Sequence, residues 1–317
     1  MQKPNFDPGL TQQYTGAVKR VINKDGRFNV RRTGRTWRDV NPYLSLINAS
    51  WPAFFGTVGA LFVIVNTIFA AIYMVIGIDN IRGTEAPSTA LRFLNACFFS
   101  AHTLTTVGYG NMWPSGPAAN TVAALEALVG LMGFAIATGL LFGRFSRPTA
   151  RFGFSTNMVI APYMEGTSLQ CRVLNRRSNN VINLQARMLL MTVESNGGRP
   201  QRKFTPLELE RDQVLFLALT WNIVHPIDET SPLYGKTAAD LDRLQAEILV
   251  LLTGFDDTFS QTVHTRYSYR YDEMVWGAKF VPAFEVDEEG ELVIEVNRVS
   301  AIQPVALAQA SDKPGLP

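Results

Sequence analysis

The chain has 317 residues, with 29 Lys or Arg against 27 Asp or Glu and a formal net charge of +2. This near balance gives no reason to expect a nucleic-acid partner, and two distant cysteines, Cys97 and Cys171, give no disulfide framework. The length allows two domains. The start of the chain is polar and basic, so we expect the first apolar segment, and not a cleaved signal peptide, to direct the chain to a membrane.

Residues 1–36 contain basic and polar residues with little apolar periodicity, and the first 40 residues carry nine Lys or Arg against three Asp. We expect a mostly extended cytoplasmic segment here. Asn41 followed by Pro42 is typical of a helix start, with Asn41 as the cap. Residues 37–50 are therefore predicted to hold a short helix in the membrane interface, with an ordinary linker as the alternative. Its apolar residues share one face: Tyr43, Leu44 and Ile47.

Two long apolar segments follow. The first, from Trp51 to Ile78, runs for 28 residues without a charge. Because roughly 20 residues cross the core of a bilayer, residues 51–78 are predicted to form an outer spanning helix. Residues 118–147 are predicted to form the inner helix, in which Glu126 is the one ionisable residue before the basic end. Basic residues before the first span and after the second predict a multi-pass protein of the inner cell membrane with both termini in the cytoplasm.

Residues 88–104, between the two spans, are too few and too polar to cross a bilayer, so they predict a re-entrant pore helix. The residues at 106–110 are Thr106-Val107-Gly108-Tyr109-Gly110. When four chains meet on one axis, their backbone carbonyls can replace the hydration shell of K⁺, and glycine permits the backbone angles required. We therefore predict a potassium selectivity filter in a homotetrameric pore domain over 51–151. K⁺ would be the permeant ion, with no covalent cofactor; a glycine-rich surface turn is the alternative.

The pattern changes after residue 151. Short β-rich runs separated by turns predict a cytoplasmic, immunoglobulin-like β-sandwich over residues 152–300, and a flexible tail over 301–317. The predicted strands are 168–174, 184–193, 214–219, 247–252, 262–270, 280–285 and 292–296. The predicted fold class is thus a membrane α plus β protein, with a two-helix potassium-channel pore and a re-entrant pore helix, followed by this sandwich.

These motifs together resemble the inward-rectifier potassium channel family, closest to its prokaryotic members. The resemblance rests on Trp51-Pro52 at the start of the first span, the filter, Arg144-Phe145-Ser146-Arg147-Pro148 after the second, and the run from His225 to Leu233. Arginine does not recur at every third position in either span, so no voltage sensor is expected. No Walker-type phosphate-binding loop is found in the sequence. Because the resemblance implies a channel, we expect no enzymatic activity.

The resemblance implies two constrictions below the filter. The first lies at Phe142, with Thr138 and Phe134 above it on the same face of the inner helix, where four phenylalanine rings can close a hydrophobic neck. The second is a cytoplasmic loop that contains Gly254 and Phe255. A lipid-facing Phe142 and a plain hairpin turn are the alternatives.

Several residues depart from the family pattern. Strong rectifiers carry an acidic residue at the position of Phe134, where Mg²⁺ or polyamines lodge, and another at that of Thr253, so strong block by these cations is not expected. His102 stands where many relatives have a glutamate behind the filter, and it either braces the filter or packs within the pore helix. Glu126 lies one residue off the pore-facing stripe and either attracts ions or forms a hydrogen-bonded brace.

Basic residues gather where the inner leaflet is expected. Anionic headgroups attract each Lys or Arg there by about 1 kcal/mol, so the channel is predicted to be modulated by anionic phospholipids; the alternative is a role in topology alone. The candidate headgroup residues are Trp37, Arg38, Arg144, Arg147 and Arg151. Two rival functions are a K⁺ uptake transporter subunit and a membrane-anchored β-sandwich that binds a soluble partner.

Overall fold

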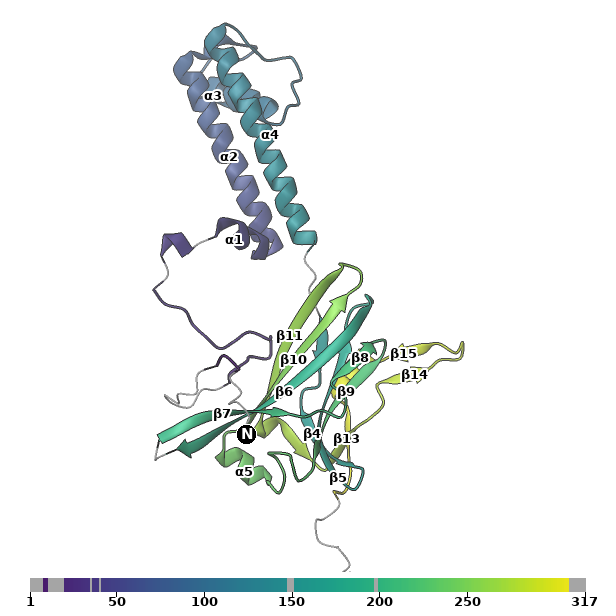
Figure 1. Ribbon diagram of the computed structural model, residues 1–317. Helices are drawn as coiled ribbons and strands as arrows, with labels where there is room; N and C mark the ends of the chain where they lie inside the picture. Colours follow the sequence, from purple (N-terminus) through teal and green to yellow (C-terminus); the bar gives the residue numbers. More distant parts are fainter. Residues whose placement is uncertain are drawn as a thin grey trace, which may run out of the picture. The chain divides into compact units, whose positions relative to one another are not determined.

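The computed structural model describes residues 8–10, 20–34, 36–39, 41–146, 151–196 and 199–307. The chain divides into two compact units (Figure 1). The helical unit comprises residues 32–147, and the β unit comprises residues 1–31 and 148–317.

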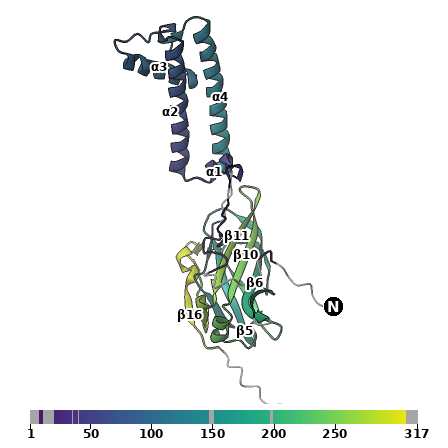
Figure 2. The same ribbon diagram turned by 90° about the vertical axis from the view of Figure 1, so that its left-hand side faces the viewer.

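The helical unit contains two long helices, α2 and α4, that lie side by side, with the shorter α3 packed against both where α2 ends and α4 begins (Figure 2). Both long helices are long and apolar enough to cross a membrane. The elements are η1 (Trp37–Asp39), α1 (Pro42–Asn48), α2 (Trp51–Ile76), η2 (Ile78–Asn80), β1 (Ile81–Arg82), α3 (Thr89–Leu104), β2 (Trp113–Pro114) and α4 (Pro117–Phe145). Strands β1 and β2 pair antiparallel and close the ends of the loops around α3.

Side-chain caps mark where α1, α2 and α3 begin. The Asn41 side chain accepts a hydrogen bond from the Leu44 amide at 3.2 Å, and Pro42 occupies the first turn of α1, as predicted. Ser50 and Ser88 cap α2 and α3 in the same way. Each cap satisfies an amide at the start of a helix that has no partner within it.

Small residues let the three larger helices pack closely around Tyr73, which is fully buried beside Phe99. Gly130 on α4 lies directly against the end of α3, because a Cβ there would come 1.9 Å from the Leu104 carbonyl oxygen. The absence of a side chain at this position therefore sets the distance between α4 and the residues that precede the filter.

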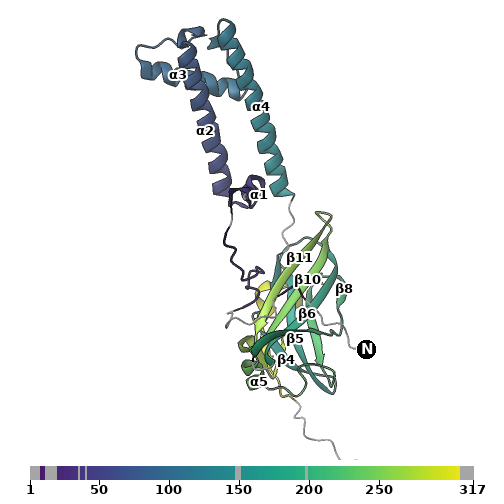
Figure 3. The same ribbon diagram turned by 60° about the vertical axis from the view of Figure 1, so that its left-hand side comes forward.

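The β unit contains two five-stranded sheets with a shared apolar core between them (Figure 3). In the first sheet the order is β11-β10-β6-β7, with β8 also paired to β6; the strands are β6 (Val181–Asn196), β7 (Arg199–Leu207), β8 (Gln213–Phe216), β10 (Glu247–Asp256) and β11 (Gln261–Arg270). In the second the order is β12-β4-β5-β3, with β9 paired to β5; the strands are β3 (Phe152–Phe154), β4 (Met158–Tyr163), β5 (Gly166–Asn175), β9 (Thr220–Ile227) and β12 (Met274–Trp276).

Shorter elements surround the sheets. They are α5 (Ala238–Arg243), η3 (Tyr271–Glu273), β13 (Ala278–Phe280), β14 (Phe284–Val286), β15 (Leu292–Ile294), η4 (Val296–Ser300) and β16 (Ile302–Pro304). Two spanning-type helices followed by a sandwich confirm the predicted fold class.

The prediction of a flexible tail from residue 301 is wrong at its start. Strand β16 pairs antiparallel with β13, with Ile302 opposite Phe280, and the Val305 amide donates to the Gly277 carbonyl at 2.8 Å. These backbone hydrogen bonds hold a segment whose composition alone gives no strand signal. The rest of the predicted tail, from 308, lies outside the described residues.

Part of the predicted N-terminal segment folds against the first sheet. Ile22 is buried, and the carboxylate of Glu247 on β10 accepts hydrogen bonds from the Val21 amide at 3.0 Å. The Ser268 hydroxyl donates to the Ile22 carbonyl at 2.7 Å. Burial raises the pKa of Glu247 above its ordinary value, and the Val21 amide acts in the opposite direction.

Candidate functional site

The predicted filter forms the loop directly after α3. The residues with positive φ alternate along it, with Thr106 at 59°, Gly108 at 54° and Gly110 at 82°. The amides of Val107 and Gly108 donate to the His102 carbonyl at 2.9 and 3.3 Å, which ties the loop to the last turn of α3. A backbone of alternating handedness can direct successive carbonyls to one side, which is the arrangement that dehydrates an ion.

His102 lies behind this loop. Its ring meets the Tyr109 ring edge-on, with 4.9 Å between the ring centres and an interplanar angle of 89°. The side chain is therefore in contact with a filter residue, through ring packing and not through a hydrogen bond between the two. This contact supports the bracing interpretation, which stays a prediction.

Glu126 is fully buried in the packing of the three helices. Its carboxylate accepts a hydrogen bond from the Tyr73 hydroxyl of α2 at 2.6 Å and another from the Ser100 hydroxyl of α3. The Ser100 hydroxyl also lies 3.0 Å from the Asn66 side-chain oxygen. One carboxylate thus links α2, α3 and α4. The sequence left two roles open for Glu126, the attraction of ions and a hydrogen-bonded brace. This geometry corresponds to the brace.

The sequence interpretation missed the partners of Glu126. Asn66, Tyr73 and Ser100 are polar side chains within apolar helices, and such residues usually face other helices and pair with one another. This signal was available in the sequence. Their contact with one another depends on how the helices pack, and the periodicity along one helix does not predict contacts between helices.

The predicted inner constriction lies on one face of α4. Phe134, Thr138 and Phe142 follow one another at intervals of four residues, so they share a face. Phe134 is 74% exposed and Phe142 is 72% exposed on the single chain. This leaves an apolar stripe available for other copies of the chain.

Arg144, near the end of α4, holds the C-terminal end of α1. Its Nη1 donates to the carbonyls of Leu46 and Ile47 at 2.6 and 3.0 Å, and its Nη2 donates to that of Ala49 at 2.8 Å. The guanidinium also lies 4.4 Å from the centre of the Trp51 ring. A helix C-terminus carries partial negative charge, so these contacts are favourable. Within the described part of the chain, the Arg144 Nε atom is buried without a hydrogen-bond partner. A headgroup contact of Arg144 therefore stays a prediction beside its contacts with the end of α1.

The other candidate headgroup residues divide into two groups. Arg38 and Arg151 are exposed. Arg147 and the side chain of Trp37 lie outside the described residues. A headgroup contact therefore stays a prediction for Arg38 and Arg151.

The predicted cytoplasmic loop is shorter than expected. Gly254 and Phe255 belong to strand β10, where they pair with Val263 and Thr262 of β11. The turn itself comprises residues 257–260. A Cβ on Gly254 would lie 2.9 Å from Val181 Cγ1, so the glycine is needed for packing against β6. The placement of these two residues in a loop was wrong, because strand pairing continues beyond the apolar run that the sequence displays.

The run from His225 to Leu233 has a structural role in the β unit. The His225 Nε2 atom lies 2.8 Å from the Ser231 hydroxyl, and its Nδ1 atom lies 2.5 Å from the Glu208 carbonyl oxygen. Burial lowers the pKa of His225 below its ordinary value. These contacts fix the turn after β9.

Comparison with known proteins identifies both units. Residues 152–314 match the family described as "Inward rectifier potassium channel C-terminal domain", and residues 54–147 match the family described as "Ion channel". The chain is also 38% identical over 298 residues to the inward rectifier potassium channel Kirbac3.1 of Paramagnetospirillum magnetotacticum, over 91% of this chain and 99% of that protein. The chain belongs to the inward rectifier potassium channel family.

More distant family members are animal channels. The chain is 28% identical over 315 residues to the G protein-activated inward rectifier potassium channel 1 of Homo sapiens and spans 62% of that protein's length. Membership of the family confirms the predicted resemblance and makes the protein a potassium channel. The comparisons give no support to the transporter or to the anchored binding protein.

Proposed function

We propose that four copies of the chain assemble in the inner cell membrane into a passive K⁺-selective channel whose termini lie in the cytoplasm. The observation that carries the proposal is the alternation of positive φ at Thr106, Gly108 and Gly110. One chain supplies a quarter of each ring of carbonyls, so a complete ion cage needs four chains.

Flux through purified protein in liposomes tests this proposal. We expect uptake of K⁺ and Rb⁺ with Na⁺ largely excluded, and a mass of four chains from light scattering in detergent. Equal flux of Na⁺ and K⁺ would contradict the filter assignment. An active monomer or dimer would contradict the assembly.

The inner gate is proposed to be a neck formed by Phe142 from each copy. Replacing Phe142 by alanine is expected to raise basal K⁺ flux, because a wider neck stays hydrated. The ratio of K⁺ to Na⁺ flux should not change, because selectivity belongs to the filter. Unchanged basal flux in this variant would assign the limiting constriction elsewhere, with Phe255 as the next candidate.

Block by intracellular cations is proposed to be weak. Phe134 removes the mid-cavity charge that would hold Mg²⁺ or a polyamine, and the Glu126 carboxylate is buried among helices. Phe134→Asp is therefore expected to increase spermine block severalfold, since charges in a confined pore are less screened than in bulk water. Spermine titrations of the unmodified channel, Phe134→Asp and Glu126→Gln measure this. Strong block of the unmodified channel that Glu126→Gln removes would overturn the assignment.

Anionic phospholipids are proposed to act through Arg38 and Arg151, while Arg144 positions α1. Arg144→Gln is expected to destabilise the channel by about 2 kcal/mol or more, because three carbonyls lose their donors. Flux of this variant should still depend on the fraction of phosphatidylglycerol as in the unmodified protein. Arg38→Gln and Arg151→Gln should each shift that dependence by about fivefold, the equivalent of 1 kcal/mol. A shifted lipid dependence in Arg144→Gln, with no shift in Arg38→Gln or Arg151→Gln, would instead make Arg144 the headgroup ligand.

A further inference from the structure

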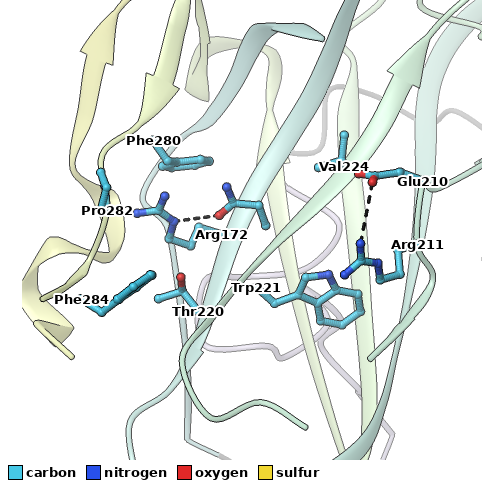
Figure 4. A pocket seen from close by; sticks show the side chains of 10 residues that line it. Arg172, Glu210, Arg211, Thr220, Trp221, Val224, Phe280, Pro282 and Phe284 are labelled. Carbon is cyan, nitrogen blue, oxygen red and sulfur yellow. Dashed lines mark hydrogen bonds and ion pairs between the residues drawn. The ribbon is translucent and has the colours of Figure 1, made fainter. Parts of the chain in front are cut away.

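A pocket of about 420 Å³ opens in the β unit beside strands β5 and β9 (Figure 4). Aromatic rings of Trp221, Phe280 and Phe284 contribute to its walls, and Arg172 lies among them. The filter, the inner helix and the N-terminal segment contribute no residue to this lining. Its volume is within the range of sites that bind small organic molecules.

Arg172 is the main charge of this pocket, and it is only 4% exposed. Its Nε donates to the Asn222 side-chain oxygen at 2.8 Å, its Nη1 donates to the Val281 carbonyl at 2.5 Å, and its guanidinium lies 4.6 Å from the centre of the Phe280 ring. These neutral partners orient the group without cancelling its charge.

No carboxylate in the part of the chain that the structure describes forms a salt bridge with Arg172. Burial lowers its pKa to about 10, so it remains charged at neutral pH. A buried cation without a counter-ion is costly. An anion in the pocket would offset that cost.

The other two charged residues of the pocket, Arg211 and Glu210, have opposite charges. Arg211 and Glu210 form a loose pair, with 4.0 Å between the Arg211 Nη2 and Glu210 Oε1 atoms. Figure 4 shows this pair on the right, beside Val224, and Arg172 on the left, beside Phe280. Two guanidiniums and one carboxylate leave a single positive charge, which matches an anion that carries one negative charge.

We propose that this pocket binds a small aromatic monocarboxylate, whose carboxylate pairs with Arg172 and whose ring packs against Phe280 and Phe284. A guanidinium presents parallel donors that match a carboxylate. Aromatic rings favour offset or edge-on packing with another ring. The pocket supplies both features within the reach of one small ligand.

Isothermal titration calorimetry on the full-length channel in detergent tests this site with three probes. We expect 1-naphthoate to bind at least about tenfold more tightly than the neutral 1-naphthamide, because the amide leaves Arg172 without a counter-ion. Inorganic phosphate, which has charge and no ring, should also bind at least about tenfold more weakly. Equal binding of naphthoate and naphthamide would overturn the proposal, as would the failure of naphthoate to bind.

Two variants locate the bound probe. Thr220→Trp fills the pocket while Arg172 is retained, and Arg172→Met removes the charge; each should weaken naphthoate binding at least about tenfold. The matched control is Arg243→Gln, which removes an exposed arginine from α5. The elution volume in size-exclusion chromatography shows whether Arg172→Met folds as the unmodified channel does. If it does not, the binding measured with Thr220→Trp tests the proposal alone. Naphthoate affinity that survives Thr220→Trp would overturn the proposal.

Discussion

Replacing Gly108 by alanine is expected to abolish K⁺ flux while the chain still folds. Gly108 has a φ of 54°, in the left-handed region where a Cβ costs about 1–2 kcal/mol. Four copies in a tetramer would carry this cost in the same ring of carbonyls. The backbone would relax to another conformation and the ring would lose its geometry. An added Cβ meets no heavy atom within 4 Å in the single chain, so a clash within the fold is not the cause.

Gly59→Ala is the matched control for this prediction. Gly59 lies within α2, and an added Cβ there meets nothing within 4 Å. Rb⁺ uptake into liposomes should be absent for Gly108→Ala and normal for Gly59→Ala, with equal elution volumes in detergent. Normal Rb⁺ uptake by Gly108→Ala would show that residues 106–110 do not form the selectivity filter.

The sequence predicted well those features that depend on local composition. A charge-free run from Trp51 specifies a spanning helix because the bilayer core tolerates few charges. Asn41 and Pro42 specify the start of α1 through local capping. The predicted filter is likewise a contiguous motif, and the loop that it forms has the expected positive φ at both glycines.

Features that depend on contact between distant residues were not predicted. The contacts of Arg144 with α1 join residues 95 to 98 positions apart, and the hydrogen bond between Tyr73 and Glu126 joins residues 53 positions apart. Strand β16 forms because β13 offers its backbone, not because of its own composition. Such contacts depend on the packing of whole elements, about which a pattern along the chain carries little information.

Gly130→Ala is expected to abolish flux by a different route, through a steric clash between α4 and α3. The added Cβ would lie 1.9 Å from the carbonyl oxygen and 2.8 Å from the carbonyl carbon of Leu104. These are backbone atoms at the end of α3, so no side-chain rotation relieves the clash, and the helices must separate. Leu104 lies two residues before Thr106, so the separation displaces the filter itself. Overpacking of this kind costs about 1–3 kcal/mol or more in each chain.

Gly133→Ala carries the same chemical change one turn further along α4, where an added Cβ meets no heavy atom within 4 Å. Alanine is favoured over glycine within a helix by about 1 kcal/mol, so this control should be as stable as the unmodified protein or more so. Thermal unfolding in detergent and Rb⁺ uptake measure the pair. We expect Gly130→Ala to unfold at lower temperature and conduct nothing, since its clash acts on the backbone that positions the filter. Equal stability and uptake in the two variants would show that α4 and the end of α3 are not in direct contact in the channel.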